Sequence, residues 1–157
     1  MNVKLITVGK TVASYLIEGE AEYQNRLKHY MRFERINITD PKGTYKLSHN
    51  EVKKKEAELI LNKLKVSDVV VLLDENGKDM SSMNFSKWFD KKGISGIRDL
   101  VFIIGGAYGF DNSIYKLAND KIRLSSMTYS HQMVRLFFLE QLYRAGTIIK
   151  GEKYHHQ

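Results

Sequence analysis

Charged and titratable side chains interrupt an apolar stretch near the C-terminus of the sequence. The stretch 130–150 is apolar in most directions, yet His131, Arg135, Glu140 and Arg144 lie inside it. The sequence then closes on Tyr154, His155, His156 and Gln157. Histidine titrates near neutral pH and is the side chain most often used as a general acid or base. Chemistry of this kind requires elements that hold the residues beside a substrate.

The elements expected to do so alternate between strands and helices. Strands are predicted at 2–8, 33–38, 68–74, 99–109 (running into glycines) and 121–126, with a turn at 75–79. Helices are predicted at 15–32, at 51–64 after a cap at Ser48 or Asn50, from Ser82 or Asn84 to Gly93, from Asp111 or Asn112 to Ala118, and from Ser130 to Lys150. Such alternation predicts a mostly parallel α/β sheet with helices on both faces. We expect one domain over 1–157.

Three predicted strands end in stretches that could bind a ligand. In open α/β sheets, ligands bind outside the carboxyl ends of the strands. Here those ends are Leu72–Asp74, Gly105–Gly109 and Leu124–Ser130. The stretches 68–74 and 99–104 are continuously apolar, as strands covered on both faces are.

The glycines at 105–109 match none of the common nucleotide motifs. G-x-G-x-x-G would require glycine at Ala107 and Phe110. The only G-K-T, at 9–11, has Lys4 where a phosphate loop has glycine, and a G-x-S-x-G elbow is absent. Two interpretations stay open: a tight strand-to-loop turn, or a backbone that approaches a flat ligand closely, as glycine permits.

Composition limits the classes of function. The net charge is +7 and the pI about 9.5, which favours a polyanionic partner, although many basic proteins bind nothing anionic. Cysteine is absent and the histidines are scattered, so we expect no disulfide, thiolate chemistry or metal site. We find no apolar run of membrane-spanning length, and the start resembles a strand rather than a signal peptide. We therefore expect a cytoplasmic protein without a membrane partner.

The helix at 130–150 suggests self-association. A helix that is apolar all round is buried all round, and a small domain surrounds a terminal helix with difficulty. We therefore expect one face to pack on the sheet and the other on a second copy of the chain. Glu140 and Arg144 are four residues apart and can pair, which would lower the cost of their burial.

Three segments together carry a family resemblance. They are the opening "VKLITVGK", "FIIGGAYG", and "LSSMTYSHQMVRLFFLEQLYRAGTIIKGEKYHH". The chain resembles SPOUT-class methyltransferases of 23S ribosomal RNA, and more narrowly the (pseudouridine-N3)-methyltransferase H family. The resemblance covers essentially the whole chain and is strongest over 99–157. Ser130 stands where the family often has proline, and the tail is one residue longer, so that His156 occupies a usually basic position.

The resemblance implies a fold, a reaction and partners. The C-terminal part of the sheet would be tied in a trefoil knot, and S-adenosylmethionine would be the methyl donor, with no metal. The cofactor would contact these residues: Leu73, Gly105, Leu124, Ser125, Ser126, Met127, Thr128 and Tyr129. The protein would be a homodimer with sites built from both chains. The substrate would be N3 of a pseudouridine in helix 69 of 23S rRNA, in the assembled ribosome.

The resemblance also implies roles for the C-terminal residues. His155 would be the general base or would orient the substrate, Tyr154 would pack on the target base, and Arg144 would stabilise the imide anion or meet a phosphate. His131 is interpreted as structural, and the lysines at 53–55 as a solvated helix face. Two other functions stay open: a non-catalytic basic RNA-binding module, and an α/β enzyme on a small nucleotide.

Overall fold

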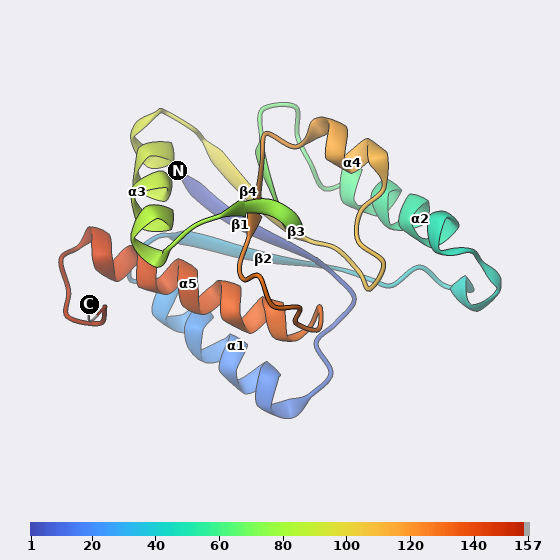
Figure 1. Ribbon diagram of the computed structural model, residues 1–157, viewed down its shortest axis with the longest axis horizontal. Helices are drawn as coiled ribbons and strands as arrows, with labels where there is room; N and C mark the ends of the chain where they lie inside the picture. Colours follow the sequence, from blue (N-terminus) through green and yellow to red (C-terminus); the bar gives the residue numbers. More distant parts are fainter. Residues whose placement is uncertain (156–157) are drawn as a thin grey trace.

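The strands form a single parallel sheet. The computed structural model describes residues 1–155, and in this range five strands pair in the order β2-β1-β4-β3-β5, every pairing being parallel (Figure 1). The strands are β1 (Asn2–Val8), β2 (Arg32–Ile38), β3 (Val69–Asp79), β4 (Asp99–Ile104) and β5 (Asp120–Arg123). The predicted α/β sheet is confirmed.

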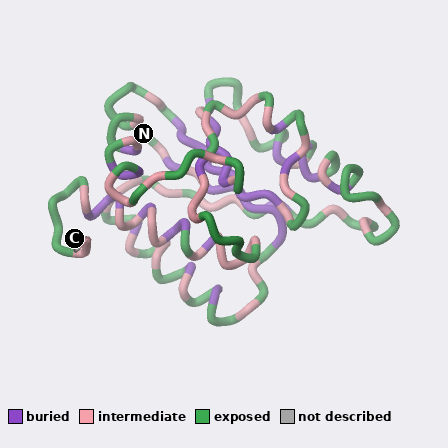
Figure 2. The backbone as a smooth tube through the Cα atoms, in the orientation of Figure 1, coloured by how far each residue is buried: buried purple, intermediate pink, exposed green. Residues whose placement is uncertain are grey.

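Helices cover both faces of this sheet, as predicted. They are α1 (Ser14–Leu27), α2 (His49–Leu61), α3 (Ser82–Ile94), α4 (Asn112–Leu117) and α5 (Met133–Ile149), with a 3₁₀ turn at Thr44–Lys46. Alternate residues of the central strand β4 point to opposite faces: Phe102 packs with α3 and α5, whereas Ile103 packs with α2 and α4. Figure 2 shows the buried strands between the two helical layers. Within residues 1–155, no helix has the length and hydropathy needed to cross a membrane.

Strand β3 is longer than predicted. The stretch 75–79, expected to be a turn, continues the strand after a register shift between Leu73 and Lys78. Beyond the shift, Lys78 and Asp79 pair with Ile122 and Arg123 of β5. A Cβ at Gly77 would lie 2.5 Å from the carbonyl carbon of Ile122, so only glycine fits this close approach.

Several helix ends also differ from their predicted positions. Helix α1 ends at Leu27 rather than at residue 32, because the chain there enters a turn before β2. Ser48 caps α2 in a capping box with Glu51, as one of the two expected caps. Helix α3 begins at Ser82, one of the two expected first residues, and Ser81 caps it. Helix α5 begins at Met133, three residues later than predicted. The backbone N–H of Met133 donates a hydrogen bond to the hydroxyl of Ser130 (3.2 Å), so Ser130 acts as a cap.

The chain itself buries one side of α5, and the other residues of the helix stay partly or fully exposed. The helix lies beside α1 and α3 and on the sheet. Phe138 is fully buried at 0% exposure, whereas the adjacent Phe137 is 37% exposed. Apolar residues on every side of a helix do not by themselves show which side chains its own protomer buries and which remain exposed to bind a partner.

The two adjacent phenylalanines give a matched test of this packing. Phe138→Ala should lower the free energy of unfolding by about 3–5 kcal/mol, because it leaves a cavity between Phe85 and Phe102. Phe137→Ala should lower it by about 1 kcal/mol or less, since its ring is partly in solvent. Urea denaturation of the two variants measures both values. Equal losses would contradict the described burial.

Candidate functional site

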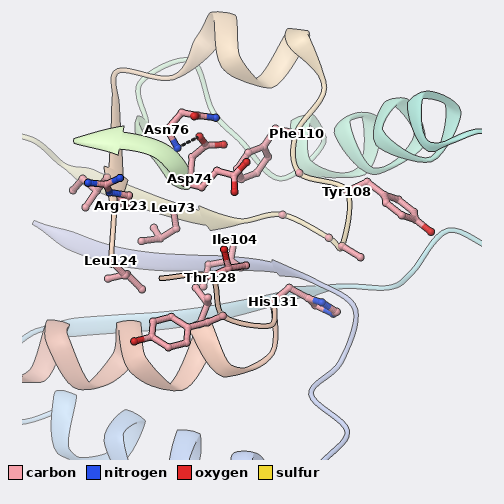
Figure 3. Close-up of a pocket in the computed structure, with 18 of the residues that line it drawn as sticks. Leu73, Asp74, Asn76, Ile104, Tyr108, Phe110, Arg123, Leu124, Thr128 and His131 are labelled. Carbon is pink, nitrogen blue, oxygen red and sulfur yellow. Dashed lines mark hydrogen bonds between the residues drawn. The ribbon is translucent and has the colours of Figure 1, made fainter. Parts of the chain in front are cut away.

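A cavity of about 850 Å³ lies at the carboxyl ends of β3, β4 and β5 (Figure 3). This is the edge of the sheet at which the sequence predicted a ligand site. All residues predicted to contact a cofactor line it: Leu73, Gly105, Leu124, Ser125, Ser126, Met127, Thr128 and Tyr129. The structure therefore brings together residues that are up to 56 positions apart in the sequence (129 minus 73).

One wall of the cavity is the loop at 105–110, here called the glycine loop. A Cβ at Gly105 would lie 3.1 Å from the ring of Phe110, so this glycine lets the loop lie tightly on that ring. The N–H of Gly109 donates to the carbonyl oxygen of Gly106 (3.3 Å), and Gly109 has a φ of +79°. Of the two readings left open by the sequence, the tight turn is thus present, and it lines a cavity.

The opposite wall is the loop between β5 and α5. The hydroxyl of Ser125 accepts a hydrogen bond from the N–H of Met127 (2.9 Å), which shapes its first turn. Met127 and Tyr129 remain exposed at 72% and 40%. Tyr129 packs on Phe137 of α5, with ring centroids 4.8 Å apart. This wall therefore presents backbone groups and partly exposed apolar side chains.

Polar residues also line the cavity, among them Asp74, Tyr115 and Arg123. The carboxylate of Asp74 accepts hydrogen bonds from the N–H of Asn76 (2.9 Å) and the hydroxyl of Tyr115 (2.5 Å). Burial and the bond to Asp74 raise the pKa of Tyr115. Arg123 pairs with Asp79 (3.2 Å), and its Nε is buried with no acceptor in the described part of the chain. The sequence indicated Asp74 only as the end of a strand and gave no sign that Arg123 lies at the site, because the pairing of β3 with β5 depends on long-range contacts.

His131 and Lys53 also line the cavity, although neither was expected at a site. Figure 3 shows His131 beside the loop that leads into α5. Burial and the guanidinium of Arg135 lower the pKa of the His131 imidazole. A neutral ring at neutral pH follows, which can both accept and donate a hydrogen bond.

The three predicted catalytic residues also lie together. The hydroxyl of Tyr154 donates to Glu140 (3.1 Å) and lies 3.3 Å from the hydroxyl of Tyr23. The guanidinium of Arg144 pairs with Glu140 (Nε–Oε1 3.0 Å), as predicted, and lies 4.7 Å from the ring centroid of Tyr154. Its Nη1 is 3.4 Å from Nδ1 of His155. The tail is therefore docked as far as residue 155, and His156 lies outside the described residues.

In one chain, this tail cluster is separate from the cavity. Figure 1 shows the C-terminal tail at the far end of α5 from the loop that follows β5. Val134 of α5 lines the cavity, and Arg144 follows ten residues later, about 15 Å along the helix. Among the described residues that line the cavity, none belongs to the tail cluster.

Comparison with known proteins identifies the family. A family model described as predicted SPOUT methyltransferase matches residues 1–155. The chain belongs to the SPOUT methyltransferase family. It is similar to a Cytophaga hutchinsonii protein named ribosomal RNA large subunit methyltransferase H, 55% identical over 156 residues, covering 99% of this chain and 100% of that one.

Further relatives and one solved structure are also similar to the chain. Proteins of the same name from Christiangramia forsetii and Parabacteroides distasonis are 53% and 51% identical over the full length of both chains. The crystal structure of the SpoU methyltransferase AviRb from Streptomyces viridochromogenes is 12% identical, with a TM-score of 0.47, covering 96% of this chain and 61% of that one.

The lowered pKa of His131 can be measured. We expect its imidazole to titrate below the ordinary value of 6.5 in the folded protein. The unfolded chain then binds a proton on His131 more readily than the folded chain does. The contribution of His131 to the free energy of unfolding is therefore fully present above the pKa of the unfolded chain and decreases as the pH falls below that pKa. NMR titration of the ring proton, assigned with His131→Asn, gives the midpoint. A midpoint at or above 6.5 would contradict the described environment.

Proposed function

We propose that this protein is an S-adenosylmethionine-dependent methyltransferase that modifies ribosomal RNA of the large subunit. One observation carries the proposal: the residues expected to contact the cofactor line one cavity at the carboxyl edge of the sheet. It is supported by end-to-end similarity to proteins named ribosomal RNA large subunit methyltransferase H. The basic net charge of +7 suits a polyanionic substrate.

The cavity fits S-adenosylmethionine in size and in chemistry. Its volume of about 850 Å³ lies in the range of small-molecule sites. Asp74 offers a carboxylate toward a cationic ligand, and Arg123, which also lines the cavity, offers a guanidinium toward a hydroxyl or carboxylate. The cofactor supplies an electrophilic methyl group on a sulfonium. The glycine loop and the 124–130 loop would hold it from two sides.

The finer proposal follows from the family. The target would be N3 of a pseudouridine in helix 69 of 23S rRNA, within the assembled ribosome, which places the protein in the cytoplasm. The trefoil knot and the single domain over 1–157 stay predictions. Methylation of the imide requires loss of a weakly acidic proton and alignment of the nitrogen with the methyl group, so positioning supplies much of the rate.

The tail cluster supports an orienting role for His155. Arginine has only donors, so Nδ1 of His155 must accept from Arg144, and the proton of a neutral ring is then on Nε2. That nitrogen is buried without a partner among the described residues. Once docking of the substrate uncovers it, this nitrogen would donate to a carbonyl oxygen of the target base, whereas a general base would need it unprotonated. Arg144 and Tyr154 would hold His155 in this position.

A second copy of the chain would bring a tail to each cavity. Exposed apolar residues gather near the cavity at the N-terminal ends of α1 and α5: Val12, Met127, Tyr129 and Phe137. The N–H of Val12 donates to Gln132 (3.0 Å), and Leu136 lies against Gly19, so these ends are joined. We propose that this surface, the α1–α5 face, forms the homodimer, with each site taking its tail from the partner.

The function is tested by binding followed by transfer. Calorimetry should detect S-adenosylmethionine binding, and ribosomes that lack the modification should acquire one methyl group, located by mass mapping of 23S rRNA. Binding of ribosomes without cofactor binding would favour the non-catalytic RNA-binding module. Preference for ATP or NAD over S-adenosylmethionine would favour the small-nucleotide enzyme. Either result would overturn the proposal.

The role of His155 gives a quantitative prediction. His155→Ala should lower the single-turnover rate on ribosomes roughly 10-fold, as for one lost hydrogen bond. The loss should vary little with pH, and cofactor affinity should stay unchanged. His29→Ala, at an exposed histidine, is the matched control. A loss of about 10²–10⁴ with an altered pH profile would identify a general base instead.

The α1–α5 face gives a prediction on assembly. Phe137→Asp should convert a dimer at micromolar concentration into a folded monomer, because an unpaired charge is expensive to bury. Val66→Asp, at another exposed apolar residue, should leave the dimer intact. Sedimentation equilibrium distinguishes the two. A wild-type monomer, or a Phe137→Asp dimer, would rule out this interface; Phe138→Asp is unsuitable because Phe138 lies in the core of the protomer.

A further inference from the structure

One face of α2 supports the glycine loop. His49, Lys53 and Glu56 are spaced by four and three residues, so they lie on the same side of the helix. His49 stacks on Tyr108 of the loop, with ring centroids 3.8 Å apart, and Lys53 lines the cavity. Glu56 lies against Gly106. The helix therefore contacts the loop at two points, one on each side of Ala107.

The contact between Glu56 and Gly106 is close and buried. Glu56 is only 6% exposed, and both oxygens of its carboxylate lie against the backbone of Gly106, whose N–H is placed to donate to them. A Cβ at Gly106 would lie 2.4 Å from Oε1 of Glu56, so no larger residue fits while Glu56 stays in place. Burial raises the pKa of the Glu56 carboxyl, and the Gly106 amide opposes this shift. An N–H that faces the carboxylate offsets part of the cost of burying it.

Fixing this N–H also fixes the peptide group that precedes it. The described peptide bonds are trans, so the carbonyl oxygen of Gly105 points away from the N–H of Gly106 and hence away from Glu56. Both glycines line the cavity. A glycine pair has more backbone freedom than any other, so without an external contact this peptide could adopt other orientations.

We infer that Glu56 is a positioning residue for the cofactor: through Gly106 it fixes the carbonyl of Gly105 as an acceptor for a hydroxyl or amino group of S-adenosylmethionine. The inference rests on the proposed function. Glu56 itself would not touch the cofactor. Its contribution is to hold the loop in its binding geometry before the ligand arrives, which lowers the cost of ordering the loop on binding.

The first experiment separates the hydrogen bond from simple packing. Glu56→Gln keeps an acceptor oxygen, whereas Glu56→Leu keeps a comparable volume without one. Calorimetry should show S-adenosylmethionine affinity within about 3-fold of wild type for Glu56→Gln and about 10-fold weaker for Glu56→Leu. Glu58→Leu, an exposed glutamate on the same helix, should bind like wild type. Urea denaturation verifies that each variant is folded.

The second experiment tests the contact itself with a double-mutant cycle. Gly106→Ala should weaken cofactor binding more than 10-fold, because its Cβ would collide with Glu56. In a Glu56→Ala background the space is open, so adding Gly106→Ala should weaken S-adenosylmethionine binding by less than about 3-fold relative to Glu56→Ala alone. Gly93→Ala, where a Cβ would meet only Met1 at 3.9 Å, is the control glycine.

The outcomes are distinct. Equal affinities for wild type, Glu56→Gln and Glu56→Leu would overturn the inference, as would a Gly106→Ala cost that is the same in both backgrounds. Should the Glu56→Ala chain fail to fold, the comparison of Glu56→Gln with Glu56→Leu decides alone. Failure of the wild-type chain to bind S-adenosylmethionine would instead overturn the proposed function, and this inference with it.

Discussion

The buried guanidinium of Arg135 joins the end of β1 to the start of α5, and the geometry of the site depends on this contact. It is 0% exposed and donates to the carbonyl oxygens of Val8 (2.5 Å) and Gly9 (3.1 Å) and to the hydroxyl of Thr11 (3.1 Å). Burial lowers its pKa, but a buried cation with such partners is retained, since removing them would leave an uncompensated charge. The contact ties the end of β1 to the first turn of α5, and thereby fixes where the 124–132 loop must end.

From this anchor, one helix serves two functional regions. Its first turns carry Val134 to the cavity and Phe138 into the core, while its last turns hold Arg144 beneath the tail. A rigid helix cannot bring its own two ends together, and about 15 Å separates Val134 from Arg144. The same rigidity that orders both regions therefore keeps them apart within a chain. This separation is the physical reason to propose that a second copy completes each site.

The sequence predicted the sheet and the cavity better than the contacts made at long range. Continuous apolar runs identified β3 and β4, and the carboxyl-end rule then located the glycine loop. The extension of β3 through Gly77 was missed because it depends on pairing with Ile122 of β5. The docking of Tyr154 likewise depends on Tyr23, 131 positions away. Local patterns carry propensity and periodicity, whereas such contacts exist only once the chain has folded.

Charge is distributed differently at the cavity and over the whole protein. Among the described lining residues, the positive charges of Lys53 and Arg123 balance the negative charges of Asp74 and Glu75. The cavity therefore has little net charge of its own when His131 is neutral. The excess of +7 must therefore come from elsewhere on the chain. A cavity with both signs of charge suits a cofactor that carries a sulfonium, an ammonium and a carboxylate, held by short contacts that salt screens weakly. An excess spread over the surface attracts RNA at long range and is screened within a Debye length of about 8–10 Å. Recognition of the cofactor and attraction of the substrate thus rest on separate sets of charges, and each can change without the other.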